Sequence, residues 1–373
     1  QTPIPRLVAT LAVPTIISML VTAVYNMADT FFVAQLGTSA AGAVGIVFSL
    51  MAVIQAIGFT FGQGSGNHIS RLLGQQQREE AEHMASVAFF SAFALGAVLG
   101  VLGTLWLDPL VDLLGATATS AGYTKDYARY ILIGCPFMVS ALVLNNQFRF
   151  QGNAIFGMVG IFSGAVVNII LDPILIFGLF GAPRLGVAGA AVATVTGQCV
   201  AAVAALIMNL KCNPDIHIVP RKIRFHGPTV KNIYRIGFPS IVMQCIGSVM
   251  VFGVNRILIS FTTTATAVFG AYFKLQSFIF MPVFGLNNGM VPIVAYNYGA
   301  KKPDRVKKTI KLAIFSAVAI MAVGLAAFEL APGALLSLFD ASENMLAIGT
   351  PALRIIALSF VLAGFCIISM SVC

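Results

Sequence analysis

Ten long stretches with almost no charged residues follow one another along this chain of 373 residues. Each is at least as long as the roughly 20 apolar residues that a helix needs to cross the hydrocarbon core of a membrane. The alternating strands of about ten residues that form a membrane β-barrel are absent. The sequence therefore predicts an all-α integral membrane protein. The predicted helices cover approximately residues 7–36, 39–70, 80–107, 124–148, 153–180, 185–210, 230–261, 264–299, 308–339 and 346–373.

The composition agrees with this prediction and excludes several classes of protein. Apolar residues make up 58% of the chain and charged residues only 9%, whereas an average soluble protein has about 25% charged residues. A water-soluble chain of this length would lack the polar side chains needed to cover its surface. A soluble globular domain, a disordered chain and a nucleic-acid-binding module are therefore excluded.

The basic residues indicate how the chain is oriented in the membrane. The formal net charge is +9, and most Lys and Arg residues lie at helix ends that would share one side of the membrane. Because Lys and Arg collect in cytoplasmic loops, that side and the amino terminus are expected in the cytoplasm. These basic residues are Arg6, Arg71, Arg78 and Arg149, together with those of segments 211–235 and 301–311.

A gap-free internal repeat emerges when the chain is compared with itself at an offset of 225 residues. Six predicted helices separate matching positions. An even number of helices preserves direction across the membrane, so the repeat is parallel, as in the two halves of many transporters. The most informative matches are Pro14 with Pro239, Gly64 with Gly289, Gly74 with Gly299, and Arg129 with Arg354.

The repeat predicts two lobes of six helices each, in a parent protein with twelve transmembrane helices. The first lobe is expected over residues 1–210, with helices 1–6, and a polar segment over 211–229 is expected to be a cytoplasmic linker. The second lobe is expected over residues 230–373, with helices 7–10. Because Cys373 corresponds to position 148 in the first lobe, the counterparts of helices 5 and 6 are expected beyond this chain.

Two carboxylates lie inside predicted membrane helices. Asp29 belongs to the first helix and Asp172 to the fifth. A charged side chain in the hydrocarbon region costs at least about 2–3 kcal/mol, so the default interpretation is a functional one. Asn26 precedes Asp29 by three residues and Asn168 precedes Asp172 by four, so each amide shares a helix face with its carboxylate.

These residues could form either of two cation sites. Carboxylate, amide and hydroxyl oxygens suit a hard cation, so Na⁺ is a candidate ligand of Asp29, Asn168, Asp172 and Thr194. Burial and a nearby like charge also favour the protonated form of a carboxyl group, so the two acids could instead bind H⁺. A third interpretation, acids that are only hydrogen-bonded inside a helix bundle, also stays open.

Proline interrupts several predicted helices, and Pro14 is the candidate hinge of the first. A proline removes one backbone hydrogen bond and favours a kink. Pro14 precedes Asp29 by fifteen residues, which is about four helical turns. Either helix 1 bends at Pro14 when Asp29 changes its charge or ligand, or the kink is static.

Two basic residues also lie within predicted membrane helices. Arg256 belongs to helix 7 and Lys274 to helix 8, and neither helix contains an acid. Such residues line an aqueous cavity or contact other helices. The candidate residues of a substrate cavity are Tyr25, Gln55, Gln244, Arg256 and Lys274.

Five segments spread over the chain form a specific combination of motifs. They are YNMADTFFVAQLGT, FGQGSGNHISRLLG, NIILDPILIFG, LGVAGAAVAT and GMVPIVAYNYGAKKPDRVKKT. Together they resemble the multidrug and toxic compound extrusion (MATE) transporters, and the DinF/MepA-like bacterial branch more than the NorM branch. The resemblance implies twelve helices in two six-helix lobes, and export of drugs or metabolites in exchange for H⁺ or Na⁺.

The resemblance also implies roles for individual residues. In DinF-like members the cation site lies in the first lobe, and the matching positions here are Asp29, Asn168, Asp172 and Thr194. Pro14 matches the proline at which helix 1 is proposed to bend. NorM-like members also use an acid in helix 7, where this chain has Gln244 and no acid.

We therefore expect a multidrug efflux antiporter that exports organic cations or other amphipathic compounds by alternating access, coupled to H⁺ or Na⁺ at the first-lobe aspartates. We do not expect the protein to be an enzyme, to use a cofactor or to bind nucleic acid. We expect a monomer that crosses the cytoplasmic (inner) membrane of a prokaryote many times. The alternative is a flippase or exporter of lipid-linked precursors or anionic metabolites. A remote alternative is an intramembrane aspartyl protease, whose YD and GxGD signatures are absent.

Overall fold

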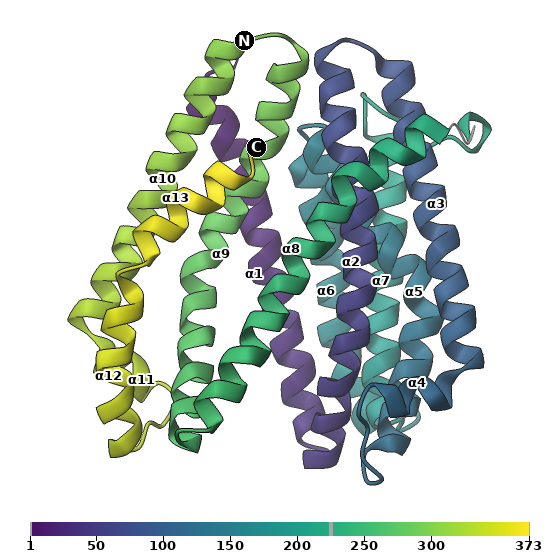
Figure 1. Ribbon diagram of the computed structural model, residues 1–373. Coiled ribbons are helices and arrows are strands. Elements are labelled where there is room, and N and C mark those ends of the chain that lie inside the picture. Colours follow the sequence, from purple (N-terminus) through teal and green to yellow (C-terminus); the bar gives the residue numbers. More distant parts are fainter. Residues whose placement is uncertain (1, 224–226, 373) are drawn as a thin grey trace. The chain divides into compact units, whose positions relative to one another are not determined.

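Helices make up nearly all of the computed structural model, which describes residues 2–223 and 227–372 (Figure 1). Over these ranges no strand is found. Nine helices in the described ranges are long and apolar enough to cross a membrane, and a tenth span is present if one bent helix pair is counted. The predicted all-α fold with about ten spans is thereby confirmed.

The first six spanning helices follow one another with short connections. A short helix, α4 (Leu107–Leu113), stands between the third and fourth spans, and a 3₁₀ turn, η1 (Leu179–Gly181), follows the fifth. The six spans are α1 (Ile4–Ala34), α2 (Thr38–Gly74), α3 (Arg78–Leu105), α5 (Ala121–Phe150), α6 (Ala154–Phe177) and α7 (Val187–Lys211).

The later helices depart from the sequence prediction at two places. The helix predicted over 308–339 ends at Leu330, because Pro332 begins a separate short helix and cannot continue the first. The helix predicted over 346–373 is broken at residues 358–359, where the two parts are bent by 46°. The elements are η2 (Pro220–Lys222), α8 (Gly227–Ile259), α9 (Thr263–Gly299), α10 (Pro303–Leu330), α11 (Pro332–Ser337), α12 (Glu343–Ala357) and α13 (Phe360–Met370).

The helix bounds reproduce the internal repeat without a gap. Both the first and the last residues of α2 and α9 are 225 positions apart, and the same holds for α3 and α10. The short helices α4 and α11 also begin at matching positions. Even the left-handed backbone of the α2–α3 turn, at Gln76, recurs in the α9–α10 turn at Lys301. The parallel repeat predicted from the sequence is therefore present in the fold.

The chain forms two compact units, and two helices contribute to both. The larger unit contains Ile17–Ile241, and the smaller contains Gln1–Ile16 together with Val242–Cys373. The division falls inside α1 and inside α8, two residues after Pro14 and two after Pro239. The lobe boundaries expected from the sequence, and a hinge at Pro14, stay predictions.

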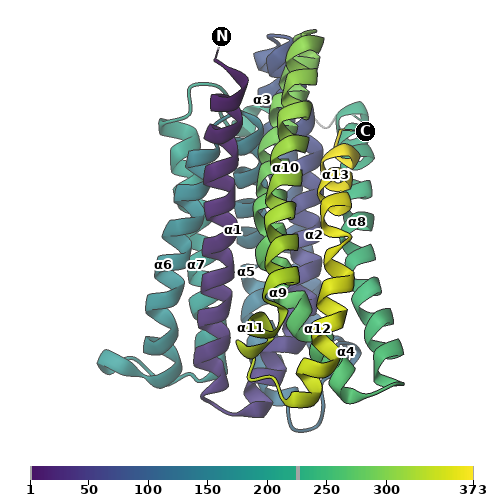
Figure 2. The same cartoon turned by 90° about the vertical axis from the view of Figure 1, so that its left-hand side faces the viewer.

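Within the larger unit, α5 is the central helix and contacts α2, α3, α6 and α7. Figures 1 and 2 show these helices side by side. A close and reciprocal approach joins α6 to α7 through two glycines. A Cβ atom at Gly164 would lie 2.5 Å from the carbonyl oxygen of Gly197, and a Cβ at Gly197 would lie 2.6 Å from that of Gly164. Only residues without a side chain allow this backbone contact, as in many membrane helix pairs.

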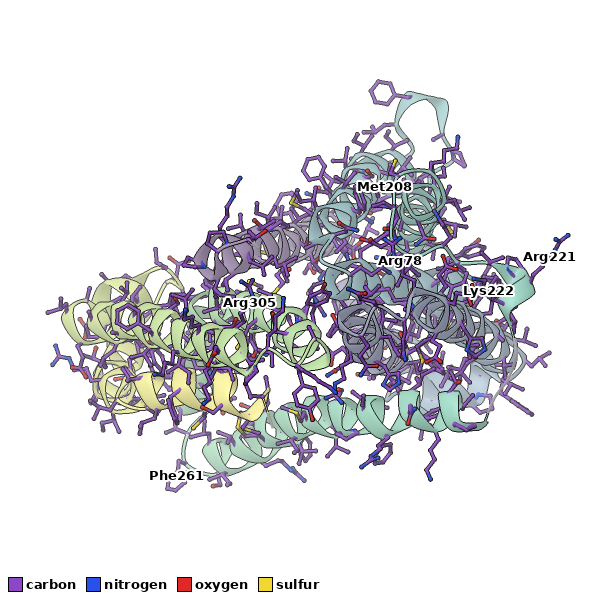
Figure 3. All side chains as sticks on the ribbon, turned by 90° about the horizontal axis from the view of Figure 1, so that it is seen from above. Arg78, Met208, Arg221, Lys222, Phe261 and Arg305 are labelled. Carbon is purple, nitrogen blue, oxygen red and sulfur yellow. The ribbon has the colours of Figure 1, made fainter. Side chains whose placement is uncertain are left out.

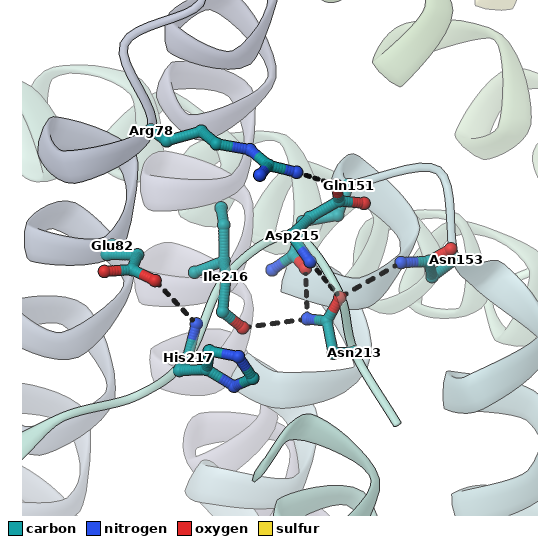
Figure 4. Close-up of polar contacts among 8 residues, drawn as sticks. All are labelled: Arg78, Glu82, Gln151, Asn153, Asn213, Asp215, Ile216 and His217. Carbon is teal, nitrogen blue, oxygen red and sulfur yellow. Dashed lines mark hydrogen bonds and ion pairs between the residues drawn. The ribbon is translucent and has the colours of Figure 1, made fainter. Parts of the chain in front are cut away.

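The linker after α7 folds back onto the same unit rather than leaving it as a loose loop (Figure 4). Asn213 is its anchor. The Asn213 amide donates to the Gln151 side chain at 2.6 Å and to the Ile216 carbonyl at 2.9 Å, and it accepts from the Asn153 side chain at 3.3 Å. The Ile216 side chain is fully buried.

Two ion pairs complete this attachment. Arg78 bonds to Asp215 at 2.7 Å, and Lys222 bonds to Glu82 at 2.5 Å. The backbone N–H of His217 also donates to Glu82, at 3.4 Å. The hydrogen bond to Glu82 raises the pKa of Lys222 above its ordinary value. Figure 3 shows that Arg221, by contrast, projects away from the ribbon. The polar segment 211–223 is therefore a docked strap.

Because α6 and α7 approach closely at Gly197, we expect a larger residue at this position to destabilise the protein. The substitution Gly197→Ala forces the two backbones apart and should lower the free energy of unfolding by about 1–3 kcal/mol. Gly42→Ala is the matched control, because a Cβ there meets nothing within 4 Å. Thermal unfolding in detergent measures both, and equal unfolding temperatures for the two variants would contradict the packing described.

The docked strap makes a second prediction. Asn213→Ala removes four hydrogen bonds of the Asn213 side chain, which include one from the backbone N–H of Asp215, and should speed tryptic cleavage at Arg221 and Lys222 severalfold. Asn153→Ala, which loses a single long bond, should change the cleavage rate little. Limited proteolysis followed by mass spectrometry measures the rates. A strap held by other contacts would be cleaved at the wild-type rate in both variants.

Candidate functional site

Five polar side chains from four helices are buried together in the larger unit. Asp29 comes from α1, Tyr127 from α5, Asn168 and Asp172 from α6, and Thr194 from α7. Their exposed fractions are between 0% and 4%. The structure thus brings together the four residues that the sequence assigned to a cation site, and it adds a tyrosine. Their role as a cation site stays a prediction.

Two hydrogen bonds link these side chains in pairs. The Tyr127 hydroxyl donates to Asp29 Oδ2 at 3.3 Å. The Asn168 side-chain amide donates to Thr194 Oγ1 at 3.3 Å. The carboxylate of Asp172 is close enough to Asp29 to feel its charge. Two like charges in an apolar interior repel strongly, so the pair favours any ligand that brings positive charge.

The decisive feature is a set of buried oxygen atoms that lack hydrogen-bond donors. Asp29 Oδ1, Asn168 Oδ1 and both carboxylate oxygens of Asp172 are buried, and no donor within the described part of the chain reaches them. A buried acceptor without a donor costs about 1–3 kcal/mol, and more when it is charged. Oxygens of this kind are suited to a proton or to a hard cation such as Na⁺.

Local sequence explains why the oxygens meet. Asn168 and Asp172 are one turn apart on α6, so their side chains lie on one face of that helix. The contact between Gly164 and Gly197 holds this part of α6 against α7, which carries Thr194. Substitution of either glycine would therefore disturb the oxygen set as well as the packing.

Tyr127 was not predicted from the sequence. It is the second of three tyrosines in the YTKDYARYILIG segment of α5, and nothing in that segment marks it as functional. Its role depends on a contact with Asp29, 98 positions earlier in the chain. Only the packing of α5 in the middle of the unit shows this contact.

The remaining candidates on α1 lie close to the buried set. Tyr25 is one turn before Asp29 and is 8% exposed. Its hydroxyl accepts a hydrogen bond from the side chain of Gln198 on α7, at 3.3 Å. Asn26 is half-buried. A polar contact between α1 and α7 therefore lies beside the contact of Asp29 with Tyr127 on α5.

The other candidates for a substrate cavity are spread over both units. Gln55 is half-buried on α2, in the larger unit. Arg256 and Lys274 are exposed in the smaller unit. Arg256 Cζ lies 6.0 Å from the ring centre of Phe252, and Lys274 Nζ lies 5.8 Å from the ring centre of Phe339. Gln244 belongs to α8, and its side chain is outside the described ones. The substrate cavity stays a prediction.

Comparison with known proteins connects this arrangement to one family. A model of the MatE family matches residues 14–174 and 239–373. The two matched segments begin at Pro14 and Pro239, which are equivalent in the internal repeat. The match therefore covers most of the chain and follows its two halves.

Three similar proteins illustrate the range of the relatives. The multidrug export protein MepA of Staphylococcus haemolyticus is 30% identical over 354 residues, which are 95% of this chain and 77% of that protein. An FAD transporter of Shewanella oneidensis is 30% identical over 317 residues, or 84% of this chain and 69% of that protein. A solved structure of a MOP superfamily transporter from Pyrococcus furiosus, whose reversed pocket polarity is said to suggest a different function, is 27% identical. It has a TM-score of 0.89 and covers 100% of this chain and 82% of that one.

The unpartnered oxygens make a prediction about stability. Asp172→Asn replaces a buried carboxylate with a neutral amide and should raise the free energy of unfolding by about 1–3 kcal/mol in Na⁺-free alkaline buffer, where the carboxylate is charged. Chemical denaturation in detergent measures the change. Asp215→Asn is the control, because it removes a partly exposed ion pair that contributes about 1 kcal/mol or less. A clear loss of stability in Asp172→Asn would mean that its carboxylate has partners after all.

Proposed function

The chain belongs to the MatE family of membrane transporters, and we propose that it exports organic cations or other amphipathic drug-like compounds in exchange for H⁺ or Na⁺. The observation that carries this proposal is the buried set of donorless oxygens on Asp29, Asn168 and Asp172. Such a set is costly in an apolar unit unless a cation occupies it part of the time. The names of relatives that export drugs support the substrate class.

The proposed exchange begins with the charge of the two carboxylates. When one H⁺ or Na⁺ binds, the repulsion between Asp29 and Asp172 falls and the donorless oxygens gain a partner. When the cation leaves, the repulsion returns. A cation can bias a conformational equilibrium only if it binds the two conformations with different affinity. A site built from four helices provides that difference, because small shifts of one helix change the oxygen geometry.

Helix α1 is the element that would carry this change to the rest of the protein. It holds Asp29 in the larger unit, whereas its first turns, up to Ile16, belong to the smaller unit. Pro14 lies two residues before that division, where the helix lacks one backbone hydrogen bond and bends more easily. We therefore propose that cation binding at Asp29 alters the bend of α1. This change would favour the conformation that opens to one side of the membrane over the conformation that opens to the other.

A second candidate function is export of anionic compounds. Arg256 and Lys274 are exposed on apolar helices of the smaller unit, and neither makes an ion pair within the described residues. One relative is named an FAD transporter, and FAD carries phosphate groups. Two such cations could hold an anionic group. Membership of a transporter family leaves an aspartyl protease without support.

Transport by the protein in proteoliposomes tests the proposal. An imposed pH or Na⁺ gradient should drive efflux of a fluorescent organic cation from vesicles that contain the wild type. Asp172→Asn should reduce gradient-driven efflux at least tenfold, because the amide cannot alternate between charged and neutral forms. The gradient that drives efflux identifies the coupling ion.

Asp112→Asn serves as the matched control, since Asp112 is exposed at the end of α4 and should not affect transport. Gradient-driven efflux that survives Asp172→Asn would contradict coupling at this site. Strong transport of anions that is lost in Arg256→Gln and Lys274→Gln, without any transport of organic cations, would favour the second candidate function.

A further inference from the structure

Two helical hairpins that are equivalent in the repeat carry opposite charges. The α9–α10 hairpin has lysine at five positions, and the α2–α3 hairpin has none at the matching ones. The five lysines are Lys301, Lys302, Lys307, Lys308 and Lys311, and their counterparts are Gln76, Gln77, Glu82, His83 and Ser86. We call the five lysines the α10 basic patch. Asp304 is the one acid among them.

Membrane orientation alone does not account for this difference. The positive-inside rule acts on every cytoplasmic connection, and both hairpins lie at the same end of their repeats. The α2–α3 hairpin nevertheless carries Glu79, Glu80 and Glu82. Its Glu82 is matched within the chain, by Lys222 and the N–H of His217 in the strap. One hairpin is therefore paired with a segment of its own protein.

The lysines of the α10 basic patch have no such partner in the described part of the chain. The ion pairs found there are Arg78 with Asp215, Lys125 with Asp108, and Lys222 with Glu82. Lys307, Lys308 and Lys311 are all exposed. Arg305, labelled in Figure 3, is different, because it donates to Asn297 at 3.1 Å and to the carbonyl of Thr2 at 2.9 Å within the smaller unit. The patch therefore presents positive charge without an ion pair among the described residues, on the first turns of α10 and on the turn that precedes it.

The lysines of the patch that belong to α10 lie next to an exposed apolar face of the same helix. The exposed apolar residues Phe315, Val323 and Leu330, with exposed fractions of 71–84%, recur at helical spacing on one face. Lys308 and Lys311 continue that face, and Lys311 is one turn before Phe315. The opposite face packs inside the unit through residues such as Ala313, Ala317 and Met321. An apolar face of a membrane helix meets lipid acyl chains, so lysines one or two turns further along it lie at the level of the headgroups.

We infer that the α10 basic patch binds the headgroups of anionic phospholipids such as phosphatidylglycerol. A lysine ammonium is a compact charge that suits a phosphate oxygen, and four to eight basic residues next to the cytoplasmic end of a membrane helix attract anionic lipid. The larger unit has its strap at the matching place. The inference does not depend on the proposed export function.

Native mass spectrometry of the detergent-purified protein tests this inference. In an equimolar mixture of phosphatidylglycerol and phosphatidylcholine, wild type should retain phosphatidylglycerol severalfold more than phosphatidylcholine. The triple variant Lys307→Gln, Lys308→Gln and Lys311→Gln should lose most of that preference. Replacement of the same three lysines by arginine should keep it, which separates loss of charge from loss of folding. Inorganic phosphate at millimolar concentration should not displace the lipid.

A second triple variant with the same change in net charge is the matched control. Lys211→Gln, Arg221→Gln and Lys231→Gln remove three exposed cations from the larger unit. This control should keep the preference for phosphatidylglycerol. The inference is wrong if the control loses as much preference as the α10 variant, or if the α10 variant keeps it. Displacement by phosphate would assign the patch to free phosphate instead of lipid.

Discussion

Buried oxygen atoms without hydrogen-bond donors are the constraint on which this structure depends. Asp29, Asn168 and Asp172 contribute such oxygens in one unit, from side chains that are at most 4% exposed. Other features of the unit serve to hold them: the glycine contact fixes α6 against α7, and Tyr127 in the central helix reaches Asp29. A purely structural role would favour donors for these oxygens, since satisfied polar groups are more stable. The missing donors therefore favour a site that exchanges a cation.

The two halves of the repeat share a backbone plan but have diverged in chemistry. The position of Asp29 in the first half is occupied by Val254 in the second. The acidic hairpin of the first half, which binds the strap, corresponds to the lysine-rich hairpin of the second. One unit thus holds the buried carboxylates, and the other holds the exposed cations Arg256 and Lys274 and the α10 basic patch. Helices α1 and α8 both belong to the two units, and α1 is the one that also carries a buried carboxylate, Asp29.

Much of this fold could be predicted from the sequence, because the hydrocarbon core of a membrane allows a spanning chain only a few backbone structures. The apolar runs predict the spans, and the repeat offset predicts matching helix ends. Asp29 and Asp172 stand out because charge is rare inside membrane helices. The contacts of Tyr127 and Asn213 could not be predicted, since they depend on which helix faces meet. The break between α12 and α13 was also missed, and no proline at residues 358–359 accounts for it.

Infrared difference spectroscopy of the purified protein tests the central claim most directly, because it observes the protonation of buried carboxyl groups. Spectra recorded between alkaline and acidic buffer, with and without Na⁺, should contain a band of a protonated, dehydrated carboxyl group. This band should be weakened by Asp29→Asn and by Asp172→Asn and unchanged by the control Asp112→Asn. If Na⁺ is the coupling ion, its addition should reduce the band at a fixed pH. Spectra of the two site variants that are identical to that of the wild type would contradict a cation site at these residues.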